Sequence, residues 1–285
     1  MPLKISIVLP AKNEAGAIST TIKGIVQVIP TAEVIVVNDG SVDHTAHLAQ
    51  TAGAKVINHP YSKGNGAAIK TGARAATGDI IVFMDADGQH DPQDITRLLE
   101  KINEGYDLVV GARQKGSQAS IGRGIANKLY NNLATYMTEH KVEDLTSGFR
   151  AVRAGKFQEF LYLLPNGFSY PTTSTMAFFR AGYSVTYIPI HAFQRIGKSH
   201  INPLKDGIRF FLIIFKIATL FSPLKMFLPF SVVLFLIATG WYGYTLYEYN
   251  RFTNMSALLY TGSIIIFLMG LISEQVTALM YKDSN

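Results

Sequence analysis

The sequence predicts an α/β protein with a mostly parallel sheet in its first two hundred residues, followed by an interfacial helix and two membrane-spanning helices. In the first part, short apolar runs alternate with helical stretches of about ten residues, the pattern of a doubly wound sheet. The 285-residue chain is 48% hydrophobic and only 16% charged, a low charge content for a soluble domain. The excess apolar residues collect near the C-terminal end, which indicates membrane segments.

The alternation can be followed along the chain, element by element. Strands are expected at residues 5–10, 32–39, 54–59, 79–85 and 106–112. Helices are expected from the end of the first strand to about Val28, and then at 43–52, 66–76 and 92–103. Because a helix separates successive strands, the strands run parallel. A ligand of such a sheet binds beyond the carboxyl ends of the strands.

Polar residues follow four of these strands at the point where each strand ends. The four segments are PAKNE (Pro10 to Glu14), NDGS (Asn38 to Ser41), DADGQ (Asp85 to Gln89) and GAR (Gly111 to Arg113). Because the carboxyl ends of parallel strands meet at one edge of a sheet, we expect these side chains to converge on one crevice.

Asp85 and Asp87 end an apolar run with two carboxylates. At positions i and i+2 of an extended backbone, the two side chains point to the same side. They repel each other unless a cation lies between them. The alternative is a solvated turn that opens the helix at 92–103, with Asp91 as its cap and Pro92 in its first turn.

A glycine-rich segment, KGNGAAIKTG at residues 63–72, raises a competing nucleotide interpretation. A dinucleotide fold would use such a turn to hold pyrophosphate at the N-terminus of the next helix. The segment follows the third expected strand rather than the first, and its last glycine is replaced. The chain also lacks a G-x-x-x-x-G-K-[ST] phosphate loop. The structural alternative is a tight turn that lets the helix approach closely.

Two stretches of 22 residues without a charge, 226–247 and 252–273, are candidate membrane helices. At about 1.5 Å per residue each spans roughly 33 Å, enough to cross a hydrocarbon core of about 30 Å. Aromatic residues form a belt in and beside the first stretch: Trp241, Tyr242, Tyr244, Tyr247 and Tyr249. The alternative is a pair of buried core helices. The short link Glu248–Ser256 predicts a hairpin with both chain ends on one side.

The charges beside the hairpin predict its orientation. Lys216 and Lys225 precede it and Lys282 follows it, whereas Arg251 is alone in the link, so the first two hundred residues and both termini are expected in the cytoplasm. The N-terminal segment is too short and too soon interrupted by polar residues to be a signal peptide. The absence of cysteine fits a reducing compartment. A two-helix hairpin has lipid-facing surface that could pack against other copies of the chain, so a homo-oligomer is possible.

The net charge of +6 is small, and the basic residues are not clustered as in a nucleic-acid groove, so no nucleic-acid partner is expected. Several basic residues precede the first membrane stretch instead. Lys205, Arg209 and Lys216 fall on nearly one face of an apolar helical stretch. This pattern predicts a helix at 201–223 in the interface plane of an anionic lipid bilayer.

The ordered motifs resemble a known family. PAKNE, VNDGS, KGNGAAIKTG, MDADGQH, GAR, DLTSGFRAVR and QRIGKSHINPLKDGIRFF, followed by two hydrophobic stretches, are similar to the family-2 glycosyltransferases of GT-A fold. Within that family the chain looks like the polyprenyl-phosphate glycosyltransferases, which include dolichyl-phosphate mannose synthases and bacterial undecaprenyl-phosphate glucosyltransferases. The resemblance implies a GT-A domain at 1–200, the interfacial helix at 201–223 and a transmembrane hairpin at 224–285.

The resemblance also implies an activity: inverting, metal-dependent transfer of one hexose from a nucleotide sugar, UDP-glucose-like or GDP-mannose-like, to a polyprenyl phosphate at the cytoplasmic membrane face. Asp39 would accept a hydrogen bond from the base. The implied donor-site residues are Pro10, Asn13, Glu14, Val37, Asp39, Lys63, Asp85, Ala86, Arg195 and Lys198. Asp85, Asp87 and Gln89 would surround Mg²⁺ or Mn²⁺, cations that prefer hard oxygen ligands completed by substrate phosphates.

On the acceptor side, a lipid phosphate is already ionised at neutral pH, so basic residues to bind it matter more than a strong base. The residues implied for this phosphate are Arg113, Arg123, Lys128 and Ser147. Asp144 would act either as a base or as an orienter of Arg113 or Arg123, and both roles stay open. The implied catalytic residues are Asp87, Asp144 and Arg113. In QRIGKSHIN, His200 stands where the family has Lys. The sequence therefore does not decide which residue closes the donor site.

Two other functions are weighed against this one. A processive polysaccharide synthase resembles the donor half but carries a Gln-x-x-Arg-Trp motif and more membrane helices, and the single tryptophan here is Trp241. An inactive, membrane-anchored nucleotide-sugar binding protein would have no physical need to keep Asp85 and Asp87 together. The sequence leaves the sugar and the base open. Glu274, in or near a membrane span, is costly unless paired, either near Lys282 or with an oligomer neighbour.

Overall fold

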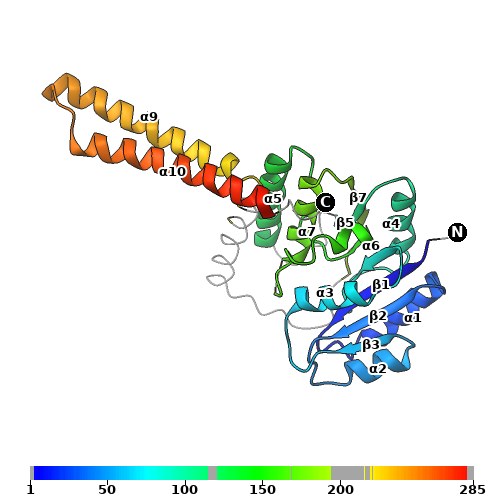
Figure 1. Cartoon of the computed structure of the whole chain (residues 1–285). Helices are drawn as coiled ribbons and strands as arrows, with labels where there is room; N and C mark the ends of the chain where they lie inside the picture. The colour runs from blue at the N-terminus through cyan, green and yellow to red at the C-terminus, as the bar shows by residue number, and fades with distance from the viewer. Residues whose placement is uncertain are drawn as a thin grey trace. The chain divides into compact units, whose positions relative to one another are not determined.

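The computed structural model describes residues 3–114, 121–167, 169–193, 215, 219 and 221–280, with the side chains of the helix at 121–138 described from Lys128 onward. The chain divides into two compact units, Met1–Asp206 and Gly207–Asn285, and Figure 1 shows the elements of each. Most of the expected interfacial helix at 201–223, including Lys205, Arg209 and Lys216, lies outside the described residues.

In the described part of the first unit, seven strands form one sheet in the order β3-β2-β1-β4-β6-β5-β7. The strands are β1 Ile5–Ala11, β2 Glu33–Asn38, β3 Lys55–Asn58, β4 Ile80–Phe83, β5 Leu108–Arg113, β6 Arg150–Arg153 and β7 Val185–Ile190. β1, β2, β3 and β4 pair in parallel, as do β5 and β7. β6 lies antiparallel between β4 and β5. The predicted fold class, a mostly parallel α/β sheet, is confirmed.

Helices cover both faces of this sheet. They are α1 Ile18–Val28, α2 Thr45–Thr51, α3 Asn65–Ala75, α4 Asp94–Asn103, α5 Ile121–Thr138, α6 Ala154–Gln158 and α7 Tyr170–Arg180. Ile7 and Leu9 of β1 share one buried cluster with residues of α1 and α4. Val8, which points to the other face, packs against Gly72 of α3. Burial on both faces explains why the central strands are continuous apolar runs rather than alternating ones.

The helix that follows β4 begins two residues later than expected, at Asp94. Asp91 is its turn residue, because Asp91 Oδ1 accepts a hydrogen bond from the backbone N–H of Gln93 at 2.9 Å. The backbone carbonyl of Asp91 accepts from the N–H of Asp94. The turn that opens α4 is therefore made by Asp91. It does not explain why two carboxylates, Asp85 and Asp87, follow β4.

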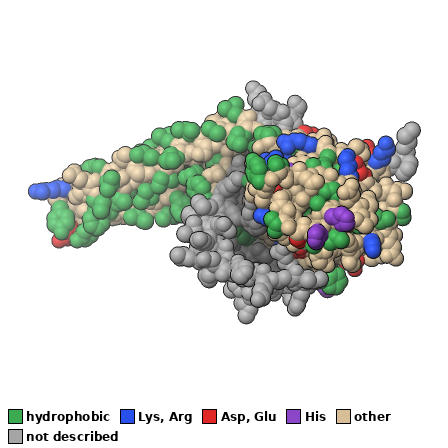
Figure 2. All heavy atoms as spheres, turned by 90° about the horizontal axis from the view of Figure 1, so that it is seen from below, with side chains coloured by type: hydrophobic (Ala, Val, Ile, Leu, Met, Phe, Trp, Pro, Cys, Tyr) green, Lys and Arg blue, Asp and Glu red, His purple; other side chains and the backbone are tan. Residues whose placement is uncertain are grey.

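The second unit contains α9 (Pro223–Tyr249) and α10 (Asn254–Met280), two helices long and apolar enough to span a membrane. Only 11% and 17% of their most apolar windows are buried, so these are not core helices of the described fold. Figure 2 shows apolar side chains along the outside of the hairpin. The buried positions include small residues seven apart, Ser231, Ala238 and Thr245 on α9 and Ser256, Ser263, Gly270 and Thr277 on α10. Small residues at this spacing let two membrane helices pack closely.

Glu274 of α10 is paired within the chain. Its Oε2 accepts hydrogen bonds from Ser222 Oγ at 3.3 Å and from the backbone N–H of Leu224 at 3.2 Å. These donors belong to the start of α9, where helix N–H groups have no intrahelical partner and a negative charge is favourable. The structure shows a contact of Glu274 with the N-terminus of α9. Lys282, one of the two partners expected from the sequence, lies outside the described residues, and the pairing with an oligomer neighbour stays a prediction.

Candidate active site

The loops after β1 and β2 are joined at the carboxyl edge of the sheet. The backbone N–H of Asn13 donates to Ser41 Oγ at 3.0 Å, and the N–H of Glu14 donates to Thr45 Oγ1 at 2.9 Å. β6 is antiparallel to both β4 and β5, so β4 and β5 point the same way and also end at this edge. The four polar strand ends predicted from the sequence therefore lie along one edge.

Asp39, at the end of β2, is buried and holds the loop between β3 and α3. Its carboxylate accepts from the Nδ1 of His59 at 2.7 Å and from Ser62 Oγ at 2.8 Å. The backbone N–H groups of Lys63 and Gly64 add bonds of 2.8 and 2.9 Å. Burial acts to raise the pKa of Asp39, but these hydrogen bonds outweigh it and lower the pKa to about 2. Asp39 is therefore an anion at neutral pH.

The four donors fill the lone-pair positions that a carboxylate offers. The predicted hydrogen bond from Asp39 to a base stays a prediction, and it requires one donor to give way. Ser62 and Lys63 are the exposed members of the four, and Ser62 is also held by Lys12, whose Nζ donates to Ser62 Oγ at 2.9 Å. His59 was not singled out from the sequence, because a lone histidine after a short strand carries no local signal.

The glycine-rich segment that begins α3 is covered by another loop. The N–H groups of Gly66 and Ala67 donate to the carbonyls of Gly167 and Asn166 at 3.1 and 2.9 Å. A Cβ at Gly66 would lie 2.0 Å from the carbonyl oxygen of Pro165. The glycine therefore permits a close approach, and the helix N–H groups that would hold a pyrophosphate are already used. The structure supports the tight-turn alternative over the dinucleotide one.

At the end of β4, Asp85 and Asp87 lie in different environments. Asp85 has a side chain that is 38% exposed, with its Oδ2 3.5 Å from the Nε2 of His90. Asp87 is buried, and its Oδ1 accepts from the N–H of Gln89 at 3.1 Å. The Nε2 of Gln89 donates to the carbonyl of Phe193 at 3.1 Å, so Oε1 is the atom of this amide that suits a cation.

This donor set fits a divalent cation that is shared with a substrate. In the part of the chain that the structure describes, no three His, Cys, Asp or Glu side chains gather to hold a metal by themselves. Mg²⁺ typically uses one or two carboxylates and completes its shell with substrate phosphates and water. Asp85, Asp87 and Gln89 supply hard oxygens of that kind, and their role as metal ligands stays a prediction.

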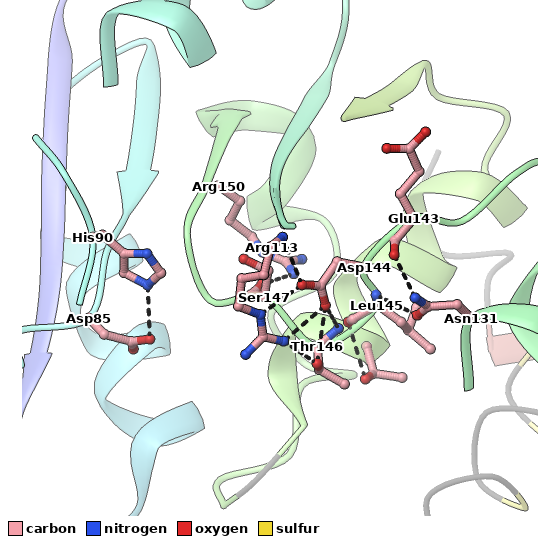
Figure 3. A network of polar contacts seen from close by, with 11 residues as sticks. Asp85, His90, Arg113, Asn131, Glu143, Asp144, Leu145, Thr146, Ser147 and Arg150 are labelled. Atoms are coloured by element: carbon pink, nitrogen blue, oxygen red, sulfur yellow. Dashed lines mark hydrogen bonds and ion pairs between the residues drawn. The ribbon is translucent and has the colours of Figure 1, made fainter. Parts of the chain in front are cut away.

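Arg113, at the end of β5, forms a bidentate pair with Asp144 (Figure 3). The distances are 2.8 Å from Nε to Oδ2 and 3.0 Å from Nη2 to Oδ1. Burial acts to raise the pKa of Asp144, but the hydrogen bonds and charge of Arg113 outweigh it and lower that pKa. The same pair raises the pKa of Arg113 against the effect of burial. Both groups therefore stay charged, and the geometry favours Asp144 as an orienter of Arg113 over a base.

The other predicted residues have varied placements. Val37 is fully buried and packs toward Gly72, so its side chain is not open to a ligand. Ser147 is 1% exposed, which leaves its predicted phosphate contact without access in this conformation. Lys128 is exposed on α5. The remaining placements are Pro10 and Glu14 half-buried, Asn13 and Lys63 exposed, and Ala86 buried. The side chain of Arg123, and Arg195, Lys198 and His200, lie outside the described residues.

The comparisons with known proteins agree with this arrangement. Residues 6–161 match the model of glycosyl transferase family 2, and residues 222–279 match that of the GtrB C-terminal hairpin. The chain is 29% identical over 233 residues to glycosyltransferase AglJ of Haloferax volcanii, covering 79% of this chain and 76% of that protein. It is 27% identical over 205 residues to the dolichyl-phosphate hexose transferase of the same organism, covering 71% of this chain and 89% of that protein.

The chain is also similar to a bacterial transferase and to a solved structure. The undecaprenyl-phosphate 4-deoxy-4-formamido-L-arabinose transferase of Proteus mirabilis is 35% identical over 162 residues, which is 53% of this chain and about half (49%) of that protein. Glucosyl-3-phosphoglycerate synthase of Mycobacterium tuberculosis, solved with Mn²⁺, UDP and glucosyl-3-phosphoglycerate, shares the fold. Its TM-score is 0.61 at 24% identity, over 75% of this chain and 78% of that chain. The family model covers more than half of the sequence, and the chain belongs to glycosyl transferase family 2.

Proposed function

We propose that this glycosyltransferase moves a single hexose from a nucleoside-diphosphate sugar to a polyprenyl phosphate at the membrane. The observation that carries the proposal is the ion pair between half-buried Arg113 and buried Asp144, because it fixes a guanidinium at the sheet edge where β4 leads into the Asp85–Gln89 segment. Asp144 and Thr146 accept from the Nε and Nη2 of Arg113, so Nη1 is the nitrogen that this pair can offer to a phosphate oxygen. The names of two relatives, which contain undecaprenyl phosphate and dolichyl phosphate, support the acceptor class.

On the donor side, Asp85, Asp87 and Gln89 would hold a divalent cation against the diphosphate. When bound, Mg²⁺ or Mn²⁺ supplies positive charge that stabilises the departing nucleoside diphosphate. The similar fold of glucosyl-3-phosphoglycerate synthase, crystallised with Mn²⁺ and UDP, supports this role. The nucleoside would lie between the loops after β1 and β2, near Asp39 and Ser62.

On the acceptor side, the nucleophile is an oxygen of the lipid phosphate. It forms a bond to the anomeric carbon of the sugar while the bond from that carbon to the nucleoside diphosphate breaks, which inverts the configuration. The attacking oxygen is already an anion, so no proton has to move in this step. Arg113 binds and aims the phosphate, and Asp144 keeps the guanidinium in place and ionised.

The hairpin supports a membrane-bound site of action. Its exposed apolar surface fits lipid. In the sequence, three lysines flank the hairpin on the side of the chain ends, at positions 216, 225 and 282, whereas the link carries Arg251 alone. We therefore propose that the catalytic unit and both termini lie in the cytoplasm.

The proposal is tested by sugar transfer with the full-length, detergent-purified protein. Radiolabelled UDP- and GDP-sugars are each offered with undecaprenyl phosphate and Mn²⁺ or Mg²⁺, and label in the organic phase is counted. We expect label from one donor, its loss with EDTA, and its loss in Asp87→Ala at unchanged folding. Mass spectrometry of the product should show one hexose per lipid. No label from any donor, or a product that carries a longer glycan, would contradict the proposal.

A further inference from the structure

Arg150 is a fully buried arginine at the start of β6, with 0% of its surface exposed. In the sheet it lies opposite Phe83 of β4 and Val110 of β5. Those two strands carry Asp85 and Arg113 just beyond these positions. Arg150 is therefore the residue of β6 that lies between the two strands that supply the donor side and the acceptor side of the proposed site.

The guanidinium of Arg150 is held by neutral oxygen atoms. Its Nη1 donates to the carbonyl of Pro171, to Ser174 Oγ and to Thr175 Oγ1, at 2.9, 2.8 and 3.0 Å. Its Nη2 donates to the carbonyl of Ser147. Among the described residues, no carboxylate lies within ion-pair distance of it. A buried charge without an adjacent counter-ion is costly, so its retention calls for a reason beyond packing.

The five-residue loop Asp144–Gly148 connects the two sides of the site, and Figure 3 shows its residues Asp144, Thr146 and Ser147 beside Arg113 and Arg150. At one end, Asp144 pairs with Arg113. At the other end, Gly148 packs against Asp85 so closely that a Cβ at Gly148 would lie 3.0 Å from Asp85 Oδ2. A single short loop therefore touches the acceptor-side cation and the donor-side carboxylate.

Arg150 and Tyr170 hold the second half of this loop. Arg150 binds the Ser147 carbonyl, and the hydroxyl of Tyr170 donates to the Gly148 carbonyl at 2.9 Å. The ring of Tyr170 lies 5.6 Å from the Cζ of Arg150, so the two side chains also support each other. The backbone of the loop is thus fixed from the protein interior, at the residues next to Asp85.

The charge of Arg150 acts on the same carboxylates over a longer distance. Burial lowers the pKa of Arg150, and the negative charges of Asp144 and Asp85 act in the opposite direction. Arg150 and these two carboxylates therefore attract each other across the site.

We propose that Arg150 is a positioning residue that clamps the Asp144–Gly148 loop and thereby sets Asp85 and the Arg113–Asp144 pair relative to each other. The inference rests on the proposed function, since it assigns Asp85 to the donor side and Arg113 to the acceptor side. Arg150 does not touch substrate. It acts by fixing the distance between the side chains that hold the donor and the acceptor. Transfer rates are sensitive to how the two substrates are placed relative to each other.

The test replaces Arg150 by lysine and by methionine in the full-length protein, with Arg153→Met as the matched control. Arg153 belongs to the same strand, but it pairs with Asp107, at 3.4 Å, near the opposite edge of the sheet. Lysine keeps the charge but cannot hold Ser147 and the α7 oxygens at once. We expect kcat of Arg150→Lys to fall about 10- to 100-fold, and that of Arg153→Met to stay within about twofold.

A second readout does not depend on the acceptor. Calorimetric titration of UDP in the presence of Mn²⁺ reports on Asp85, and we expect both Arg150 variants to bind UDP at least about threefold more weakly than the Arg153→Met control. A merely structural role would lower the thermal midpoint while leaving kcat and UDP binding of the folded fraction unchanged. That outcome would overturn the inference.

Tyr170→Phe keeps the test decisive if the Arg150 variants do not fold. It removes only the hydroxyl that binds the Gly148 carbonyl, and we expect kcat to fall about three- to tenfold. A folded Tyr170→Phe protein with wild-type kcat and wild-type UDP binding would contradict the clamp. A wild-type protein that neither transfers sugar nor binds UDP with Mn²⁺ would overturn the proposed function, and the inference with it.

Discussion

Both carboxylate oxygens of Asp144 accept hydrogen bonds from Arg113, whose Nε, Nη2 and backbone N–H are the donors. Thr146 adds its backbone N–H to Oδ1 at 3.1 Å. A carboxylate used in this way has little capacity left to take a proton from a substrate. The pair therefore behaves as one oriented cation with a built-in counter-ion, and its two halves can be separated by substitution.

Asp144→Asn should weaken acceptor binding without abolishing transfer. The amide keeps the shape but loses the charge and one of the acceptor atoms, so Arg113 is less firmly oriented. Hydrogen bonds to charged groups contribute about 1.5–3 kcal/mol each, so we expect the acceptor KM to rise roughly tenfold or more. Steady-state kinetics with varied polyprenyl phosphate measures it. A complete loss of kcat with unchanged acceptor KM would instead indicate that Asp144 is a base.

Acid should destabilise the first unit through Asp39. The pKa of Asp39 is lowered from its ordinary value of 3.8 to about 2 in the folded protein. A group with a depressed folded pKa contributes stability above its unfolded pKa and loses it as the pH falls through the folded pKa. The window of loss therefore runs from about pH 4 down to about pH 2.

Asp39→Asn makes this window visible. At neutral pH we expect its thermal midpoint to lie about 5 °C below that of the wild type, because charged hydrogen bonds are lost. Between about pH 4 and pH 2 the two midpoints should converge. Glu104→Gln is the control, since that carboxylate is 51% exposed. A gap between Asp39→Asn and wild type that stays constant down to pH 2 would contradict the prediction.

Gly66→Ala should destabilise the fold rather than act on nucleotide binding alone. Its methyl group would meet the Pro165 carbonyl at 2.0 Å, so either α3 or the loop at 165–167 has to move. We expect a loss of about 1–3 kcal/mol in unfolding free energy. Gly155→Ala, where nothing lies within 4 Å of the added carbon, should be neutral or slightly stabilising. Unchanged stability of Gly66→Ala with lost nucleotide binding would restore the pyrophosphate interpretation.

Gly270→Leu should loosen the hairpin, whereas Gly243→Leu should not. A Cβ at Gly270 would lie 2.8 Å from the Cβ of Phe227, and at Gly243 nothing lies within 4 Å. Thermal loss of helical circular dichroism in detergent measures the difference. Equal midpoints for the two variants would show that the seam between α9 and α10 does not depend on small residues.

Much of the first unit was predictable because its physics is local. Apolar runs and intervening helices place β1 to β5, and the rule for parallel strands predicts that their polar ends share one edge. β6 was not predicted, because four residues that begin and end with arginine resemble an exposed segment. Its antiparallel place between β4 and β5 is a tertiary pairing that no periodicity encodes.

The site was predictable in its residue types but less so in its contacts. Asp85, Asp87, Arg113 and Asp144 follow from motif order and charge. The four donors around Asp39 come from a loop twenty or more residues away, and the covering of α3 comes from a loop about a hundred residues away. Such contacts depend on which loops meet in space. The burial of Arg150 could not be predicted either, because it depends on contacts with distant residues and because arginine is usually exposed.

The position of β6 has a consequence for how the chain acquires its structure. β1 to β4 form from the first part of the chain, but β5 has no partner in that sheet until β6 has been synthesised and inserted beside β4. Until then, β4 offers an open edge of four buried apolar residues, which is a hazard for association with other chains. A nascent chain that stalls before residue 150 should therefore depend on chaperones, and the two sides of the catalytic centre should mature one after the other.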